Sequence, residues 1–270
     1  MIVMSNEYKR GFIQMLIWSL VCSLIVALFL LLYYFSGGAG LSTTYGDFLN
    51  KLPDPLTAFL GFNKLLDDDF YYYLANAYRP ILALSCFYAT KLGLASISAE
   101  DKKGTSSFLY SFPVSRFQIV AQKILGTLFL YLTFCVIVCG VTIGLTLLAV
   151  PEIVLIDLLL NLALLISSIF LVGFVYCLIG FLISSKPKTL RSPSFVSLCI
   201  IFLGMLISAA AENSQILQIL SYFFPYSYAL PLEIINTGMS ILHYILAVGI
   251  SLLCIGLTLI LQRKKPYLPA

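Results

Sequence analysis

Six long apolar runs decide what this chain can fold into. They cover residues 11–34, 75–97, 124–149, 153–184, 194–211 and 240–261. Each approaches or exceeds the roughly 20 residues that a helix needs to cross ~30 Å of hydrocarbon. Only helices and closed barrels satisfy their backbone groups in lipid, and the runs show no period-2 alternation. The sequence therefore predicts an all-α integral membrane protein of six transmembrane helices, a single domain over residues 1–270, with both termini on one side.

The composition indicates lipid as the solvent for much of the chain. Hydrophobic residues make up 60% of the sequence and charged residues 10%, against roughly 25% charged residues in a soluble domain. A soluble protein of this length could not bury that much apolar surface in one core. All seven cysteines lie in apolar runs, which is typical of small buried side chains and not of disulfides or metal ligands.

The basic residues predict the orientation. Most of them precede the first run, follow the last, or lie between runs two and three or four and five: Lys9, Arg10, Lys102, Lys103, Arg116, Lys123, Lys186, Lys188, Arg191, Arg263, Lys264 and Lys265. The opposite loops hold most of the acidic residues. Basic residues favour the cytoplasmic side of a membrane. We therefore expect a multi-pass protein of the cell membrane with both termini in the cytoplasm.

Two segments outside the runs have the character of the membrane surface. Residues 4–12, "MSNEYKRGF", predict a short N-terminal interfacial helix, with a frayed terminus as the alternative. Residues 218–238, "QILSYFFPYSYALPLEIINTG", are too apolar for a free loop and are broken by Pro225 and Pro231. This second segment predicts re-entrant or interfacial helices between spans five and six.

Residues 99–116, "AEDKKGTSSFLYSFPVSR", form a polar insert between the second and third spans. The run from Thr105 to Phe112 is compatible with a helix, and Phe108 and Phe112 share one face of it. Pro113 ends that helix. An amphipathic helix on the cytoplasmic side either lies on the lipid surface or fills a groove on a soluble partner.

The end of the insert carries a start signal for the next helix. Ser115 and Gln118 have the spacing of a capping box, and Val114 and Ile119 occupy the positions of a hydrophobic staple. The sequence therefore predicts a short helix, a sharp turn and a defined start for the helix of span three. Gly140 and Gly144 form a G-x-x-x-G pattern within that span, which can mark a helix contact but is common in membrane helices.

The insert resembles the stretch after span two of type-2 ABC exporter permeases (ABC-2 type). The residues that carry the resemblance keep their order and spacing: Glu100, Gly104, Thr105, Phe108, Leu109, Ser111, Pro113, Val114, Ser115, Arg116, Ile119 and Lys123. The chain is most similar to the compact six-span permeases related to the copper-enzyme maturation transporter. It departs from that pattern at Ser107, where those permeases often have an acidic residue.

The resemblance implies that residues 99–116 form a coupling helix seated in a groove of an ABC ATP-binding subunit. Phe108 and Leu109 would be the buried anchors, and Glu100 and Arg116 the polar rim or hinge. The second cytoplasmic loop either makes a secondary contact or only sets the topology, through Lys186, Lys188 and Arg191. Two ATP-binding subunits would pair with two permease subunits, identical or related, in the lipid.

Residue types that are missing narrow the function. The chain contains no G-x-x-x-x-G-K-[ST] phosphate loop, so ATP and magnesium would be bound by the partner subunit. We expect this chain to have no cofactor, no metal, no enzyme activity and no nucleic-acid partner. The sequence has one histidine, His243, and no acidic residue at mid-membrane, which argues against a zinc protease and an ion-coupled carrier. The predicted function is export of a hydrophobic or amphipathic cargo (a peptide, antibiotic or lipid-like molecule); the alternative is an ATP-independent secondary carrier or membrane scaffold.

Overall fold

The computed structural model describes residues 2–35, 69–103, 116–185, 192–211 and 215–263, with side chains in 7–35, 69–96, 117–185, 192–211 and 215–261. These ranges contain helices and no strand. The helices are α1 (Ile2–Phe35), α4 (Phe70–Lys103), α6 (Arg116–Ala149), α7 (Leu155–Ser184), α8 (Pro193–Ala211), α9 (Gln215–Ser221), the 3-10 helix η2 (Pro225–Ala229), α10 (Pro231–Thr237) and α11 (Ile241–Arg263). The predicted all-α class is confirmed.

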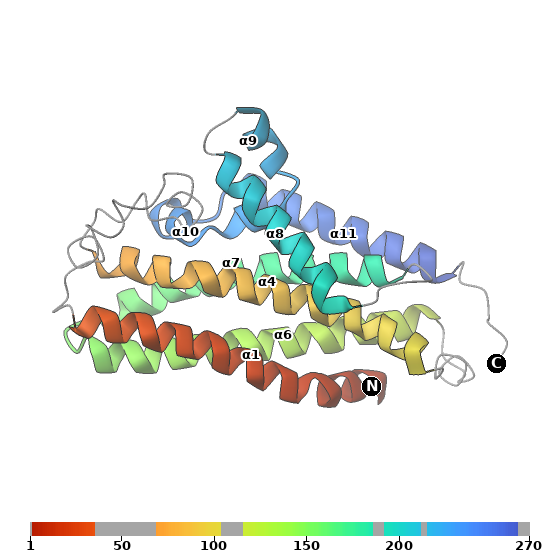
Figure 1. Cartoon of the computed structure of the whole chain (residues 1–270), viewed down its shortest axis with the longest axis horizontal. Helices are drawn as coiled ribbons and strands as arrows, with labels where there is room; N and C mark the ends of the chain where they lie inside the picture. Colours follow the sequence, from red (N-terminus) through yellow and green to blue (C-terminus); the bar gives the residue numbers. More distant parts are fainter. Residues whose placement is uncertain (1, 36–68, 104–115, 186–191, 212–214, 264–270) are drawn as a thin grey trace.

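The helices pack in three layers (Figure 1). α1 lies along α6, α4 lies along α7, and α8, α10 and α11 cover the other side of the α4–α7 pair. α1 begins and α11 ends at the same end of the bundle. At that end α4 also ends and α6 begins (Figure 1). The start of α1 and the end of α11 therefore lie at one end of the bundle, and the side of the membrane that this end faces remains a prediction.

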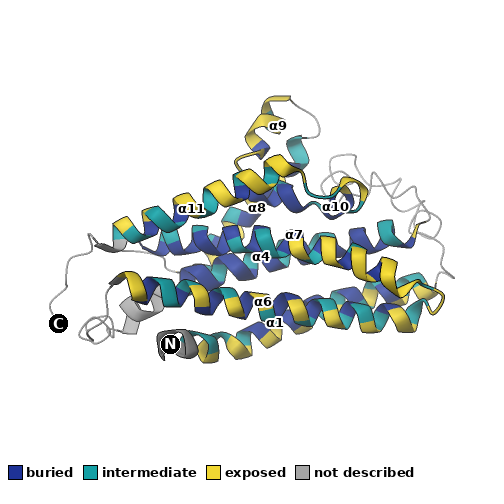
Figure 2. Cartoon of the chain, turned by 180° about the vertical axis from the view of Figure 1, so that it is seen from behind, coloured by how far each residue is buried: buried dark blue, intermediate teal, exposed yellow. Residues whose placement is uncertain are grey.

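Five helical segments among the described residues are long and apolar enough to cross a membrane. They cover Glu7–Phe35, Phe117–Ala149, Leu155–Ser184, Pro193–Ala211 and Ile241–Leu261, and they coincide with five of the six predicted spans. Their outward faces are largely exposed along α1, α8 and α11 (Figure 2). Exposed Leu, Ile and Phe side chains on these faces are what a lipid solvent requires.

The remaining predicted span, 75–97, lies within α4, which is not among the five segments. α4 is 34 residues long, but it carries Asn76, Arg79 and Lys91 within that stretch. It packs against α1, α6, α7, α8 and α10, so most of its side chains face protein. An interior helix can carry more polar residues than a lipid-facing one, and a count of six spans remains a prediction.

Two predicted surface segments have different outcomes. Residues 4–12 belong to α1, which runs from Ile2 to Phe35 as one helix, so the N-terminal interfacial helix is not a separate element. The segment between α8 and α11 is broken as predicted, into α9, η2 and α10. Pro225 opens η2 and Pro231 opens α10, because proline is tolerated in the first turn of a helix, where its missing N–H is not needed.

Large aromatic side chains form the centre of the bundle. Tyr88, Tyr131 and Phe134 are almost fully buried, with ring centroids 5.1 Å apart for Tyr88–Phe134 and 5.8 Å for Tyr131–Phe134. The Tyr131 hydroxyl donates to the Ile169 carbonyl oxygen at 3.1 Å, which joins α6 to α7. Buried tyrosine hydroxyls usually find such a partner, and this bond links the two layers.

Candidate functional site

Most of the residues predicted to contact an ATP-binding subunit lie outside the described residues. These are Gly104, Thr105, Phe108, Leu109, Ser111, Pro113, Val114, Ser115, Lys186, Lys188 and Arg191. Glu100 and Arg116 lie in helical backbone at the end of α4 and the start of α6, and the structure does not describe their side chains. The contact itself therefore remains a prediction, and the structure describes the two helices that flank it.

Two residues of the resembling stretch lie within the described part of α6. Ile119 and Lys123 are four residues apart and each is 3% exposed, so they share a buried face of the helix. Ile119 is an apolar side chain at a packed position, and its predicted staple partner Val114 lies outside the described residues. Lys123 is a cationic side chain at an equally buried position, and this calls for a polar partner.

Lys123 finds that partner on α4. Its ammonium donates a hydrogen bond to the main-chain carbonyl oxygen of Ser96 at 2.9 Å. A carbonyl oxygen has two lone pairs, so it can accept from a side chain in addition to a helical N–H. A hydrogen bond from a charged donor is roughly twice as strong as a neutral one. Lys123 therefore ties the start of α6 to the end of α4.

Two further helices contact the same stretch of α4. The Arg10 guanidinium of α1 donates to the Ala95 carbonyl oxygen at 3.4 Å. The Ser184 hydroxyl of α7 donates to the Phe181 carbonyl oxygen of its own helix at 3.0 Å and lies 3.5 Å from the Gly93 carbonyl oxygen. We call these three contacts of Arg10, Lys123 and Ser184 with α4 carbonyls the α4 collar. Through the collar, three different helices hold the main chain of α4 shortly before it reaches the predicted contact segment.

α4 and α7 also meet backbone to backbone at the collar. A Cβ atom added at Gly180 would lie 2.5 Å from the Thr90 carbonyl oxygen and 3.0 Å from the Leu94 nitrogen. A Cβ added at Gly93 would overlap the Cys177 carbonyl oxygen. Glycine is therefore required at both positions. By contrast, a Cβ at Gly140 or at Gly144 would have no neighbour within 4 Å in the described structure, so the G-x-x-x-G pattern marks no close contact there.

Lys91 lies two residues before Gly93 of the collar and faces α1. Its ammonium is 5.9 Å from the centre of the Trp18 ring, a distance at which a cation is attracted to the face of an aromatic ring. Trp18 also packs on Phe87 and Tyr88 of α4, with ring centroids 5.2 and 6.2 Å away. These contacts extend the junction between α1 and α4 towards the centre of the bundle.

The opposite end of α4 is held by neutral groups and a cap. The Asp69 carboxylate accepts from the Tyr71 N–H at 3.1 Å, which is the arrangement of a helix N-cap. Burial, followed by the Asp157 and Asp69 carboxylates, raises the pKa of Tyr71. The Tyr73 hydroxyl donates to the Phe29 carbonyl oxygen of α1 at 2.6 Å.

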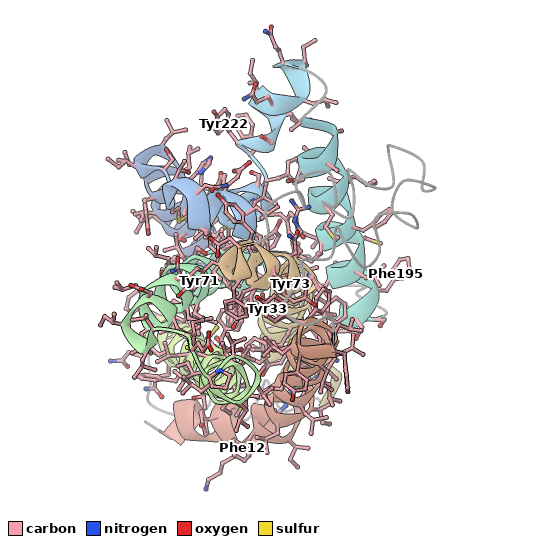
Figure 3. The ribbon with its side chains drawn as sticks, turned by 90° about the vertical axis from the view of Figure 1, so that its left-hand side faces the viewer. Phe12, Tyr33, Tyr71, Tyr73, Phe195 and Tyr222 are labelled. Atoms are coloured by element: carbon pink, nitrogen blue, oxygen red, sulfur yellow. The ribbon has the colours of Figure 1, made fainter. Side chains whose placement is uncertain are left out.

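Aromatic contacts continue this end of the bundle. The rings of Tyr33 and Tyr73 lie 5.0 Å apart between α1 and α4 (Figure 3). Tyr72 donates to the Asn236 side chain of α10, and His243 stacks on Tyr228 at 4.8 Å. His243 therefore belongs to an aromatic stack. Within the described ranges, no group of three or more His, Cys, Asp or Glu side chains could hold a metal ion.

The arrangement of helices defines a polytopic all-α membrane protein. A family model described as "ABC-2 family transporter protein" matches residues 12–261. Because that match covers almost the whole chain, the protein belongs to the ABC-2 transporter family, as the sequence of the insert predicted. No curated protein matches the chain. Membership makes the chain the membrane component of a transporter, a permease.

Sequence reasoning identified Lys123 but missed its role and most of the collar. Lys123 stood out as the last residue of the resembling stretch, and Arg10 only as a basic residue before the first span. Gly93, Gly180 and Ser184 carry no motif. The one available signal was the combination of small residues near the ends of two long apolar runs, which can allow helices to approach closely.

Proposed function

We propose that the chain is the permease subunit of an ATP-driven exporter. The observation that carries this proposal is the family match over residues 12–261. The sequence has no phosphate loop of its own, so the energy would come from a separate ABC ATP-binding subunit that holds ATP and magnesium. Two copies of that subunit would act on two permease halves in the cell membrane, either a homodimer or a related heterodimer.

In this proposal α4 also crosses the membrane, as the second of six spans, and is enclosed by the other helices. Both termini and the junction between α4 and α6 then face the cytoplasm, where basic residues concentrate. Residues 99–116 are accessible to the ATP-binding subunit in that orientation. Phe108 and Leu109 anchor the contact, flanked by Glu100 and the Pro113–Arg116 turn, and Lys186, Lys188 and Arg191 make the secondary contact.

The cargo of the proposed exporter is hydrophobic or amphipathic. In the proposed dimer, part of the exposed apolar helix surface would face the second permease half and the pathway and not lipid; Leu198 and Phe202 of α8 and Leu252 of α11 are examples of such exposed side chains. A pathway bounded by such side chains favours a peptide, an antibiotic or a lipid-like molecule over a small hydrophilic solute, whose polar groups would lose water without gaining partners.

The test is purification of the full chain from the membranes of its own cells. A co-purifying protein with a phosphate loop and an ABC ATPase activity is expected. Phe108→Asp should abolish co-purification, because burying a carboxylate at an apolar contact costs several kcal/mol or displaces the helix. Ser106→Ala, within the same insert, should leave co-purification unchanged.

Two results would contradict the proposal. One is an unchanged yield of the ATP-binding subunit with Phe108→Asp. The other is a wild-type chain that purifies without any ATPase and whose transport is abolished by a protonophore, which would identify the ATP-independent carrier instead.

A further inference from the structure

A buried cation on an otherwise apolar helix requires an explanation. α6 is a candidate membrane span over Phe117–Ala149, and Lys123 is the one lysine or arginine within it. The Lys123 side chain is only 3% exposed. Burying a charged side chain against protein is costly unless it finds a polar partner. One partner that the structure provides is the Ser96 carbonyl oxygen at 2.9 Å.

The acceptor of this bond is a main-chain atom, and this determines what the bond can do. The Ser96 hydroxyl is also buried, but it has no hydrogen-bond partner in the described structure. The Lys123 ammonium therefore hydrogen-bonds to the main chain of α4, which cannot rotate away as a side chain can. A bond to the backbone fixes the position of the helix itself.

The position of this bond relates it to the predicted contact segment. Ser96 lies about two turns before the end of α4 at Lys103, and Lys123 lies about two turns after the start of α6 at Arg116. The same stretch of α4 accepts a hydrogen bond from Arg10, lies beside the Ser184 hydroxyl and touches the α7 backbone at Gly93. A displacement of either helix end is therefore opposed at one level of the bundle by three neighbouring helices.

We propose that Lys123 is a positioning residue that makes the end of α4 and the start of α6 move as one unit during transport. The inference rests on the proposed function, because the movement would be delivered by an ATP-binding subunit acting between these two helices. Without the tie, α6 would shift at its start while α4 stayed in place, and the rest of the bundle would not follow. Lys123 itself touches neither ATP nor cargo in this role.

The first arm of the test measures the tie directly. Hydrogen–deuterium exchange is followed by mass spectrometry on the full chain in detergent, for wild type, Lys123→Met and Lys123→Arg. Methionine keeps an unbranched apolar side chain and removes the cation, whereas arginine keeps a cationic donor. Amides in 93–103 and 116–124 should exchange at least about tenfold faster in Lys123→Met, the factor that corresponds to about 1.4 kcal/mol. Lys123→Arg should remain near wild type.

Thr146→Val is the matched control on the same helix. Thr146 is also fully buried, but its hydroxyl has no hydrogen-bond partner within the described part of the chain. This variant should leave exchange in 93–103 and 116–124 unchanged. If Lys123→Met does not yield folded protein, Lys123→Gln takes its place, since its amide remains polar but has no charge; the same local acceleration is expected.

The second arm measures coupling without knowledge of the cargo. The complex with the ATP-binding subunit is compared without nucleotide and after trapping with Mg-ATP and vanadate. In wild type, trapping should change exchange in residues 70–85 of α4, far from the insert. In Lys123→Met that change should fall to less than about one fifth, although the complex still assembles and hydrolyses ATP. A residue that only stabilised the fold would not separate hydrolysis from the distant response.

The possible outcomes distinguish the positioning role of Lys123 from the proposed function. Unchanged local exchange in Lys123→Met, or equal acceleration in Lys123→Met and Lys123→Arg, overturns the role of the ammonium whatever the protein does. A full nucleotide response in Lys123→Met overturns the positioning role and leaves the proposed function intact. A wild-type complex with no nucleotide response at all overturns the proposed function, and the positioning role with it.

Discussion

Replacing Gly180 by alanine is a severe test of the packing between α4 and α7. The added Cβ would lie 2.5 Å from the Thr90 carbonyl oxygen, 3.0 Å from the Leu94 nitrogen and 3.2 Å from the Gly93 Cα. Close carbon–oxygen contacts between helices are normally about 3.3–3.6 Å. All three neighbours are main-chain atoms, so no side chain can rotate to make room, and the helices must separate by roughly 1 Å at this point.

Two terms of opposite sign set the size of the effect. Alanine is favoured over glycine in the interior of a helix by about 1 kcal/mol. Overpacking costs typically about 1–3 kcal/mol, and a backbone-to-backbone clash belongs at the upper end of that range. We therefore expect Gly180→Ala to lower the free energy of unfolding by roughly 2 kcal/mol.

Trp18 provides the assay. It is the only tryptophan of the chain, and it packs on Phe87 with 5.2 Å between ring centroids, so its fluorescence reports the junction of α1 with α4. A loss of 2 kcal/mol should lower the midpoint of thermal unfolding in detergent by about 4–8 °C.

Gly140→Ala is the matched control, since its Cβ has no neighbour within 4 Å among the described residues. It should gain up to about 1 kcal/mol from helix propensity alone. If Gly180→Ala proved as stable as Gly140→Ala, the close contact of α4 with α7 would be refuted.

Three further expectations follow from particular bonds and from the topology. Tyr78→Phe should destabilise the fold by about 1 kcal/mol, because the Tyr78 and Thr142 hydroxyls share a buried hydrogen bond of 2.8 Å between α4 and α6; in a double-mutant cycle with Thr142→Val, additive losses would argue against that bond. Asp69→Ala should cost about 1 kcal/mol through loss of the α4 N-cap, while Asp69→Asn should retain most of it; equal losses in the two unfolding curves would remove the cap as the cause. A reporter enzyme fused to the C-terminus should be active only in the cytoplasm, and activity outside the cell would reverse the predicted orientation.

The helical fold was predictable because lipid leaves few choices. Long apolar runs with no period-2 alternation must be helices, and five of the six predicted spans coincide with helices of that character. α4 is the informative exception. Its polar residues Asn76, Arg79 and Lys91 weaken the apolar signal, yet it packs against helices of all three layers. Hydropathy measures how well a helix suits lipid, so it gives a low score to a membrane helix whose neighbours are protein.

The collar could not be predicted, because its acceptors are backbone atoms. Every residue has a carbonyl group, so nothing in the sequence marks Gly93, Ala95 or Ser96 as the ones that receive a side chain. The same limit applies to close helix contacts. The visible pattern at Gly140 and Gly144 lies in open space, whereas isolated Gly93 and Gly180 touch. Whether a glycine allows close approach depends on which face of its helix meets a neighbour, and that is decided by the whole bundle.

The two ends of α4 are held by different kinds of group, and this asymmetry bears on how transport would proceed. At the collar, charged Arg10 and Lys123 donate to main-chain carbonyls. At the other end, neutral hydroxyls such as those of Tyr72 and Tyr73 make the cross-helix bonds. The Lys123 bond is charge-assisted, buried and 2.9 Å long, whereas the Arg10 bond is exposed and 3.4 Å long. If an ATP-binding subunit acts at the junction of α4 and α6, as proposed, Lys123 is therefore the collar contact best placed to make the two helices move together.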